Sequence, residues 1–88
     1  MKNVFVVMGT TGELKDHNEW AVIAYLDEAA AQEHVVNAGH RAKELFATRP
    51  DRYSIENGAN EFDPNMRMDY TGTSYFIYTV PLAKKKAV

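Results

Sequence analysis

The chain has 88 residues, enough for one domain with a small core, and its formal net charge of −2 is close to neutral. Dedicated nucleic-acid-binding proteins usually carry a clear excess of basic residues, so this composition disfavours that class. Cysteine is absent, which excludes disulfide bonds and thiolate zinc sites. The apolar run Val4–Met8 is too short to cross a bilayer and has no cleavage pattern, so we expect neither a membrane anchor nor a signal peptide.

Two strands are predicted in the first part of the chain. Residues 3–8 (NVFVVM) are apolar at both odd and even positions, which is typical of a central strand covered on both faces. The segment GTTG at 9–12 breaks this pattern, and a polar connection follows it. Residues 19–26 (EWAVIAYL) predict a second strand, in which Trp20 shares one face with the other even-numbered residues and the odd-numbered residues form the opposite face.

A long amphipathic helix is predicted from Asp27 to Thr48, and the other elements are expected to pack on it. Asp27 is suited to cap the helix, because its carboxylate can accept a hydrogen bond from a free N–H group of the first turn. Pro50 disfavours continuation of the helix through the preceding residue. Gly39 costs about 1 kcal/mol relative to alanine, and its small size predicts close approach of a sheet residue. The expected buried face consists of Ala31, Val35, Ala38, Ala42 and Leu45, widened by Val36 and Phe46.

The last third of the chain combines a long loop with one strand. The apolar residues of 59–73 follow neither a helical nor a strand spacing, so this segment is predicted to be a loop. Loops of this length tend to be functional or mobile. Residues 74–82 (SYFIYTVPL) predict a strand with Tyr75 on one face and Tyr78 on the other. Pro81 cannot donate a backbone hydrogen bond, so the strand should end there or lie at an edge of the sheet.

The order strand–strand–helix–strand predicts a single α+β domain within residues 1–83, followed by a basic tail at 84–88. We expect a three-stranded, mainly antiparallel sheet of ββαβ layout, with the helix packed on one face and the strand at 3–8 in the middle. One helix covers only one face of a sheet. The other face would be a bare apolar patch, which predicts a homodimer or another bound partner at that face.

No motif in the chain predicts catalysis or a metal site. The histidines do not converge at helical spacing, and the acidic loop 63–69 has Arg67 where a calcium loop needs an oxygen ligand. Neither serine follows the pattern of a nucleophile elbow. We therefore expect a protein that is not an enzyme and that needs neither a metal nor another cofactor.

The most distinctive string is DYTGTSY at 69–75, which mixes polar and aromatic residues just before the last strand. Tyrosines offer large rigid contact areas with a polar tip, which protein interfaces use. The alternative is a turn whose tyrosines cover the edge of the core. Acidic side chains in the same region would suit a basic surface on a partner. The predicted partner-binding residues are Glu61, Asp63, Asp69, Tyr70, Tyr75 and Tyr78.

Three passages resemble small orphan proteins that phages and prophages encode: VFVV at 4–7, EWAVIAYLDEAAAQ at 19–32 and DYTGTSYFIYTVPL at 69–82. Those proteins begin with two strands, continue into one long helix and end in a tyrosine-rich strand. The resemblance concerns layout over most of the chain, and no catalytic residues come with it. It implies an accessory protein in the cytoplasm of a bacterial host, where some such proteins bind host proteins and block defence systems such as CRISPR effector complexes.

The leading hypothesis is therefore a non-enzymatic protein-binding accessory protein of phage or prophage origin, with inhibition of a CRISPR-type defence complex as one form of that activity. The first alternative is a small nucleic-acid-binding module that uses the sheet aromatics and Lys84–Lys86, a class that the slightly acidic chain disfavours. The second alternative is a dimeric ligand-binding domain with a pocket between its subunits.

Overall fold

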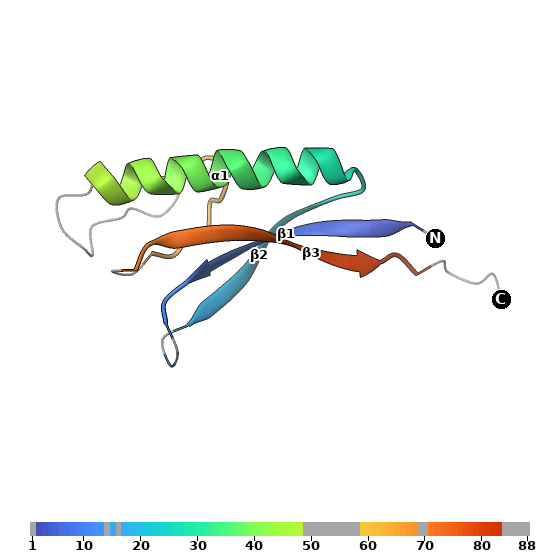
Figure 1. Ribbon diagram of the computed structural model, residues 1–88, viewed down its shortest axis with the longest axis horizontal. Helices are drawn as coiled ribbons and strands as arrows, with labels where there is room; N and C mark the ends of the chain where they lie inside the picture. The colour runs from blue at the N-terminus through green and yellow to red at the C-terminus, as the bar shows by residue number, and fades with distance from the viewer. Residues whose placement is uncertain (1, 14, 16, 49–58, 69–70, 84–88) are drawn as a thin grey trace.

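One sheet and one helix make up the fold. The structure is a computed structural model that describes residues 2–13, 15, 17–48, 59–68 and 71–83. The elements in chain order are β1 (Asn3–Thr11), β2 (Asn18–Tyr25), α1 (Glu28–Thr48) and β3 (Thr73–Pro81). The strands form an antiparallel sheet, and α1 lies across one of its faces (Figure 1). The predicted α+β fold of ββαβ layout is confirmed.

Strand β1 is the centre of the sheet, because the strand order is β2-β1-β3. Its apolar residues at both odd and even positions predicted this place. It runs on to Thr11, however, and the break predicted after Met8 was wrong. The reason is that Gly9 pairs with both neighbours, with Trp20 of β2 on one side and Tyr75 of β3 on the other. Pairing on both sides stabilises an extended backbone that local sequence alone disfavours.

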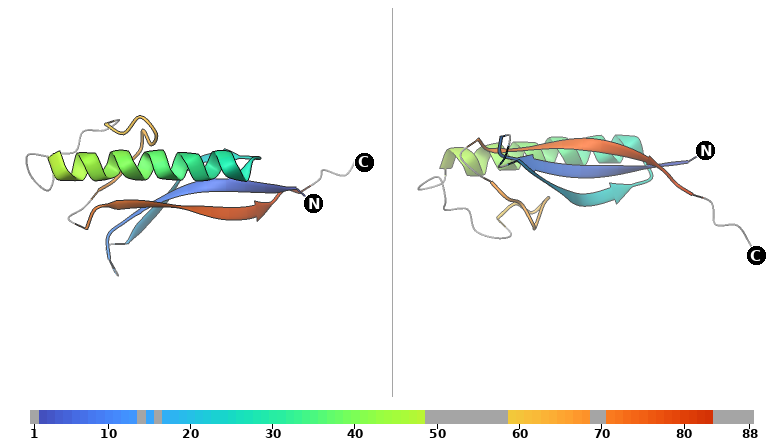
Figure 2. Two further views of the ribbon diagram at one scale, coloured as in Figure 1. Left: turned by 45° about the horizontal axis from the view of Figure 1, so that its top comes forward. Right: turned by 90° about the horizontal axis from the view of Figure 1, so that it is seen from below.

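The two faces of the sheet differ in their cover. Odd-numbered residues of β1 face α1, and Val7 and Thr11 are buried there, with 0% and 6% of their surface exposed. Even-numbered residues of the same strand, Val4, Val6 and Met8, keep part of their surface exposed. Figure 2 shows α1 on one side of the sheet in both views. The helix therefore builds the core on one face and leaves the other face open.

A bulge in β2 changes which of its residues face the helix. Val7 of β1 pairs with Ile23 and Met8 pairs with Ala21, so Val22 is the extra residue between them. The bulge turns Trp20 onto the face that carries Ile23, toward α1. The predicted alternation, which placed Trp20 on the same face as Val22, was therefore wrong. Side chains of a strand alternate between faces, so one extra residue moves every residue beyond it to the other face.

The helix packs through small side chains. Asp27 caps it as predicted, since its Oδ1 accepts a hydrogen bond from the N–H of Ala29 at 3.1 Å. Val36, which the predicted stripe included, is 65% exposed, so the buried face is narrower than predicted. The buried residues of α1 are Ala31, Ala38 and Ala42.

Two glycines differ in their surroundings. A Cβ on Gly9 would lie 2.5, 2.6 and 2.7 Å from three indole atoms of Trp20. These nearly equal distances indicate that the indole lays its face on the backbone of Gly9. A Cβ on Gly39 would meet no atom within 4 Å, so the predicted close approach of a sheet residue to this helical glycine was wrong.

Replacement of Gly9 with alanine should destabilise the fold by about 1–3 kcal/mol, the usual cost of overpacking, because the new methyl group overlaps the indole. Gly39→Ala is the matched control: it adds the same atoms into open space and should stabilise the helix by about 1 kcal/mol. Urea unfolding followed by circular dichroism measures both. Equal midpoints for the two variants would contradict the packing of Trp20 on Gly9.

Candidate functional site

The segment 59–68 is held tightly against the sheet and the helix. Asn60 and Asp63 are 0% and 1% exposed, although both are polar. The N–H of Asp63 donates to the carbonyl of Asn60 at 3.0 Å, and the N–H of Met66 donates to the carbonyl of Asp63 at 3.1 Å. Two consecutive turns thus direct both polar side chains inward, where they need hydrogen-bond partners.

Asp63 joins the two outer strands through one carboxylate oxygen. Its Oδ2 accepts a hydrogen bond from Trp20 Nε1 at 2.8 Å and another from the Tyr75 hydroxyl at 2.7 Å. Trp20 and Tyr75 stand on opposite sides of Gly9, which has no side chain to separate them. The other oxygen, Oδ1, is buried and has no hydrogen-bond partner in the described part of the chain.

Asn60 links the same cluster to the helix. Its Nδ2 donates to the carbonyl of Ala38 at 3.2 Å and lies 3.4 Å from the Tyr75 hydroxyl and 3.5 Å from Met66 Sδ. Its Oδ1 accepts the N–H of Phe62 at 2.9 Å. The side chain therefore satisfies a helix carbonyl and a loop amide at once, which fixes the distance between α1 and the segment 59–68.

Tyr75 remains a hydrogen-bond donor at all ordinary pH values. Burial raises the pKa of its phenol well above the usual range, and the hydrogen bond with Asp63 and the charge of that carboxylate raise the pKa further. A hydrogen bond with Asn60 acts in the opposite direction. The phenol thus keeps the proton that it donates to Asp63.

His34 makes a second connection between the helix and the rest of the molecule. Its Nε2 lies 2.7 Å from the carbonyl of Phe62, which can only accept, so Nε2 carries the ring proton. Its Nδ1 then accepts the hydroxyl hydrogen of Tyr25 at 2.9 Å. The imidazole also meets the Phe62 ring edge to face, with centroids 5.9 Å apart. These contacts hold α1, β2 and the segment 59–68 in one arrangement.

Two of the predicted partner-binding residues have structural contacts instead. Asp63 is buried, so its carboxylate is not offered to a partner, contrary to the prediction. Tyr75 lies on the helix-facing side of the sheet, with its hydroxyl on Asp63. The alternative interpretation, a tyrosine that covers part of the core, describes Tyr75. The local sequence Asp63-Pro64 is typical of a solvated turn and carries no signal of this long-range contact.

The other predicted contact residues do not form one surface. Glu61 is exposed, and its carboxylate lies 3.4 Å from Arg41 Nε of α1. Tyr78 is 61% exposed on the opposite face of the sheet. Asp69 and Tyr70 lie outside the described residues. Glu61 and Tyr78 are therefore on different sides of the molecule.

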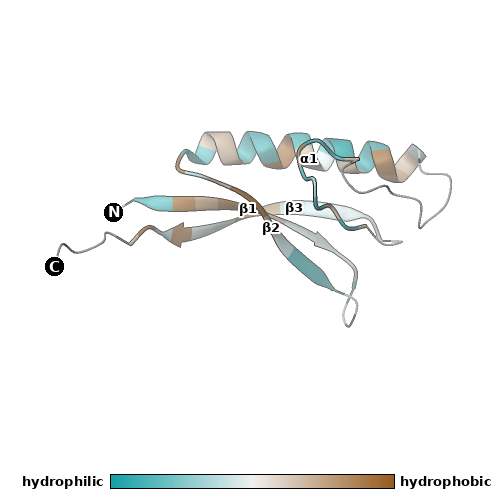
Figure 3. Cartoon of the chain, turned by 180° about the vertical axis from the view of Figure 1, so that it is seen from behind, coloured by the Kyte–Doolittle hydropathy of each residue, from teal (hydrophilic) through white to brown (hydrophobic). Residues whose placement is uncertain are grey.

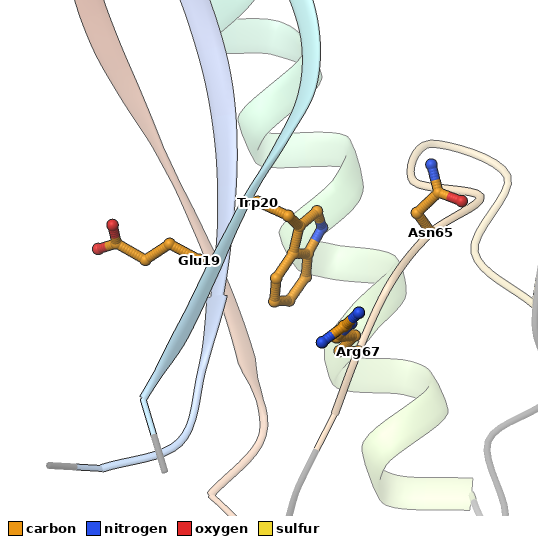
Figure 4. A pocket seen from close by; sticks show the side chains of 4 residues that line it. All are labelled: Glu19, Trp20, Asn65 and Arg67. Atoms are coloured by element: carbon orange, nitrogen blue, oxygen red, sulfur yellow. The ribbon is translucent and has the colours of Figure 1, made fainter. Parts of the chain in front are cut away.

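A shallow groove of about 410 Å³ lies between β2 and the segment 59–68, lined by Glu19, Trp20, Asn65 and Arg67. Figure 4 shows that the Glu19 side chain points to the opposite side of β2 from the other three. The groove thus presents an indole, an amide and a guanidinium. These groups suit stacking and hydrogen bonding with a small polar ligand.

The larger candidate site is the sheet face away from α1, which we call the open face. Tyr78 projects most from it, with 61% of its surface exposed. Figure 3 colours each residue by its hydropathy, and the hydrophobic residues of the sheet include a stretch of β1 and part of the end of β3. Thr10, Ser74 and Glu19 form a polar end of this face. Its apolar side chains, by strand alternation and register, are Val4, Val6, Met8, Ala21, Ala24, Phe76, Tyr78 and Val80.

The buried core on the helix side is small by comparison. Among the described residues, only Val7, Asn60 and Asp63 are large side chains with less than 2% exposure, and two of these are polar. The buried apolar residues are Val7, Ala31, Ala38, Ala42 and Met66. A short chain buries a modest share of its surface in any case. The helix side thus buries few large apolar side chains, while the apolar side chains of the open face keep part of their surface in contact with water.

Comparison of the chain with protein-family models, with characterised proteins and with solved structures found no match. Within the described ranges, no three His, Asp or Glu side chains are placed to hold a metal ion. No helix among these residues is both long and apolar enough to span a bilayer. Function therefore has to be inferred from the surfaces of this chain.

Asp63→Ala should destabilise the protein by about 2 kcal/mol or more, because it leaves the indole N–H of Trp20 and the hydroxyl of Tyr75 without their acceptor. Glu61→Ala, two residues away and exposed, is the control and should change stability by less than about 1 kcal/mol. Urea unfolding monitored by tryptophan fluorescence compares them. If Asp63→Ala lowers the free energy of unfolding no more than Glu61→Ala does, the structural role of the carboxylate is refuted.

Alkaline pH should weaken the fold through Tyr75. An unfolded tyrosine releases its proton near pH 10, whereas burial raises the pKa of Tyr75 in the folded chain. Above about pH 10 the folded state binds more protons than the unfolded state, so the stability gained from this group is complete below that pH and falls as the pH rises. The stability difference between the wild type and Tyr75→Phe should therefore shrink above about pH 10. A difference that stays constant from about pH 8 to 11 would contradict the burial.

Proposed function

We propose that this protein is a non-enzymatic protein-binding domain whose contact surface is the open face of its sheet. The observation that supports the proposal is that no helix covers this face, whose apolar side chains keep part of their surface exposed, opposite a helix-side core built largely from alanines. Contiguous apolar area of this kind on a small protein usually marks an interaction surface. Each square ångström that a partner removes from water contributes roughly 25 cal/mol.

Tyr78 is the central candidate on this face. It is 61% exposed, and its cross-strand neighbour on β1 is Val6. A tyrosine brings a large rigid ring with few rotatable bonds and a hydroxyl that can bond at the rim, which makes it a common anchor of interfaces. The Asp63 cluster on the other face fixes the sheet in advance, so little ordering is left to oppose binding.

A photo-reactive side chain tests the proposal directly. Replacement of Tyr78 with p-benzoylphenylalanine keeps an aromatic ring on the open face, and the same replacement at Val36 serves as the control. Val36 is similarly exposed, at 65% against 61% for Tyr78, but lies on the helix. Irradiation in a bacterial lysate should give a discrete protein adduct at position 78 and little at position 36. Absence of an adduct at 78, or equal labelling at both positions, would contradict the proposal.

A further inference from the structure

We infer that the occupant of the open face is a second copy of this chain, stacked face to face across a two-fold axis that runs along the strands. This inference rests on the proposed function, because it names the partner of the same face. It is carried by the shape of the face, by its charge and by the position of α1.

The open face slopes from one edge of the sheet to the other. In the central paired rows, β3 contributes aromatic side chains, β1 contributes Val or Met, and β2 contributes alanines, with the bulge residue Val22 unpaired between them. Its two central rows, read from β3 to β2, are Tyr78–Val6–Ala24 and Phe76–Met8–Ala21. The result is an aromatic ridge along β3 beside a shallow strip along β2.

Such a slope is complementary to itself under one particular symmetry. Consider a two-fold axis that lies between the two faces and runs parallel to the strands. It reverses the side-to-side order of the strands in the second copy, so β3 of one copy lies above β2 of the other. Sheets stack about 10 Å apart, and the ridge around Tyr78 then fills the strip around Ala24 of the partner copy. An axis across the strands would instead set ridge on ridge and leave the alanine strips apart.

The charge of the face also suits a second copy. The even-numbered residues of β1 and β3 that form it are uncharged. Glu19 lies at one end, opposite Thr10, and its carboxylate is 3.0 Å from His17 Nε2. Two copies therefore meet without like charges at the centre of the contact, where such pairs cost most.

The position of α1 disfavours the other simple dimer, in which two β3 strands pair edge to edge. The helix contacts β3 more than the other strands and lies behind it in the right-hand view of Figure 2. Paired strands are about 4.8 Å apart, whereas packed helices need about 8–10 Å between their axes. Edge pairing would thus crowd the two helices against each other, while face-to-face stacking keeps them on the outside.

The size of the face predicts a dimer that dissociates on dilution. Strands of about nine residues span roughly 30 Å, and three of them are about 14 Å across. Two such faces bury on the order of 1,000 Å², which is at the lower end of specific interfaces.

Introduced cysteines test both the partner and the axis, because the chain has no cysteine of its own. Tyr78→Cys and Ala24→Cys chains, tagged to differ in mass, are mixed at high concentration and treated with dibromobimane, a short thiol cross-linker. We expect the 78–24 product between copies to exceed the 78–78 and 24–24 products at least tenfold. Val36→Cys, on the exposed side of the helix, should give almost no linked product. Circular dichroism confirms that each variant is folded.

The outcomes separate the inference from the proposed function. A dominant 78–78 product, or no linked dimer, overturns the two-fold stacking. If the photo-reactive residue at position 78 still captures another protein, the open face remains a binding surface with a different occupant. If neither experiment yields an adduct at position 78, both proposals fall.

Discussion

The carboxylate of Asp63 is the contact on which the rest of the structure depends. One of its oxygens accepts hydrogen bonds from Trp20 of β2 and Tyr75 of β3, two strands that do not touch each other in the sheet. Gly9 makes this possible, because any larger residue on the central strand would occupy the place of the indole. Hydrogen bonds to a charged acceptor are roughly twice as strong as neutral ones, and removal of the acceptor would leave two donors unpaired. Asn60 extends the cluster to the helix.

This arrangement explains why the two faces of the sheet are so different. The helix-facing side uses its large aromatic residues to satisfy a buried carboxylate, and the helix meets the sheet through alanines. Phe76 and Tyr78 fall on the opposite face because neighbouring residues of a strand point to opposite sides. The polar cluster gives the sheet a fixed shape, and the open face is where burial can still be gained. This division is the basis on which we propose a protein-binding role for that face and a second copy as its occupant.

Local patterns in the sequence were sufficient to predict the order of the elements, the central position of β1 and the cap at Asp27, since each depends on nearby residues. They failed where pairing over long distances decides the outcome. The strand continues through Gly9 because both neighbours pair with it, and the bulge at Val22 turns Trp20 toward the helix. Asp63 lies 43 residues from Trp20 along the chain, so nothing local distinguishes it from a solvated turn residue. A glycine inside a strand opposite two aromatics is a usable signal, but only once the register is known.

The phage origin, the host target and the role against a CRISPR-type defence complex stay predictions from the resemblance in layout. The open face is compatible with several biological settings, because an apolar contact surface specifies chemistry rather than source. Tyr78 alone of the predicted contact residues lies on this face among the described residues.

Hydrogen exchange of the Trp20 indole tests the central claim most directly. The chain has one tryptophan, so a nuclear magnetic resonance spectrum shows a single indole N–H signal that needs no assignment by mutation. The hydrogen bond to Asp63 predicts that this proton exchanges with deuterium only when the whole domain unfolds, at the same rate as the slowest backbone amides of β1. Exchange of the indole proton at the rate of a free indole, while the β1 amides stay protected, would show that the Asp63 contact does not hold the fold together.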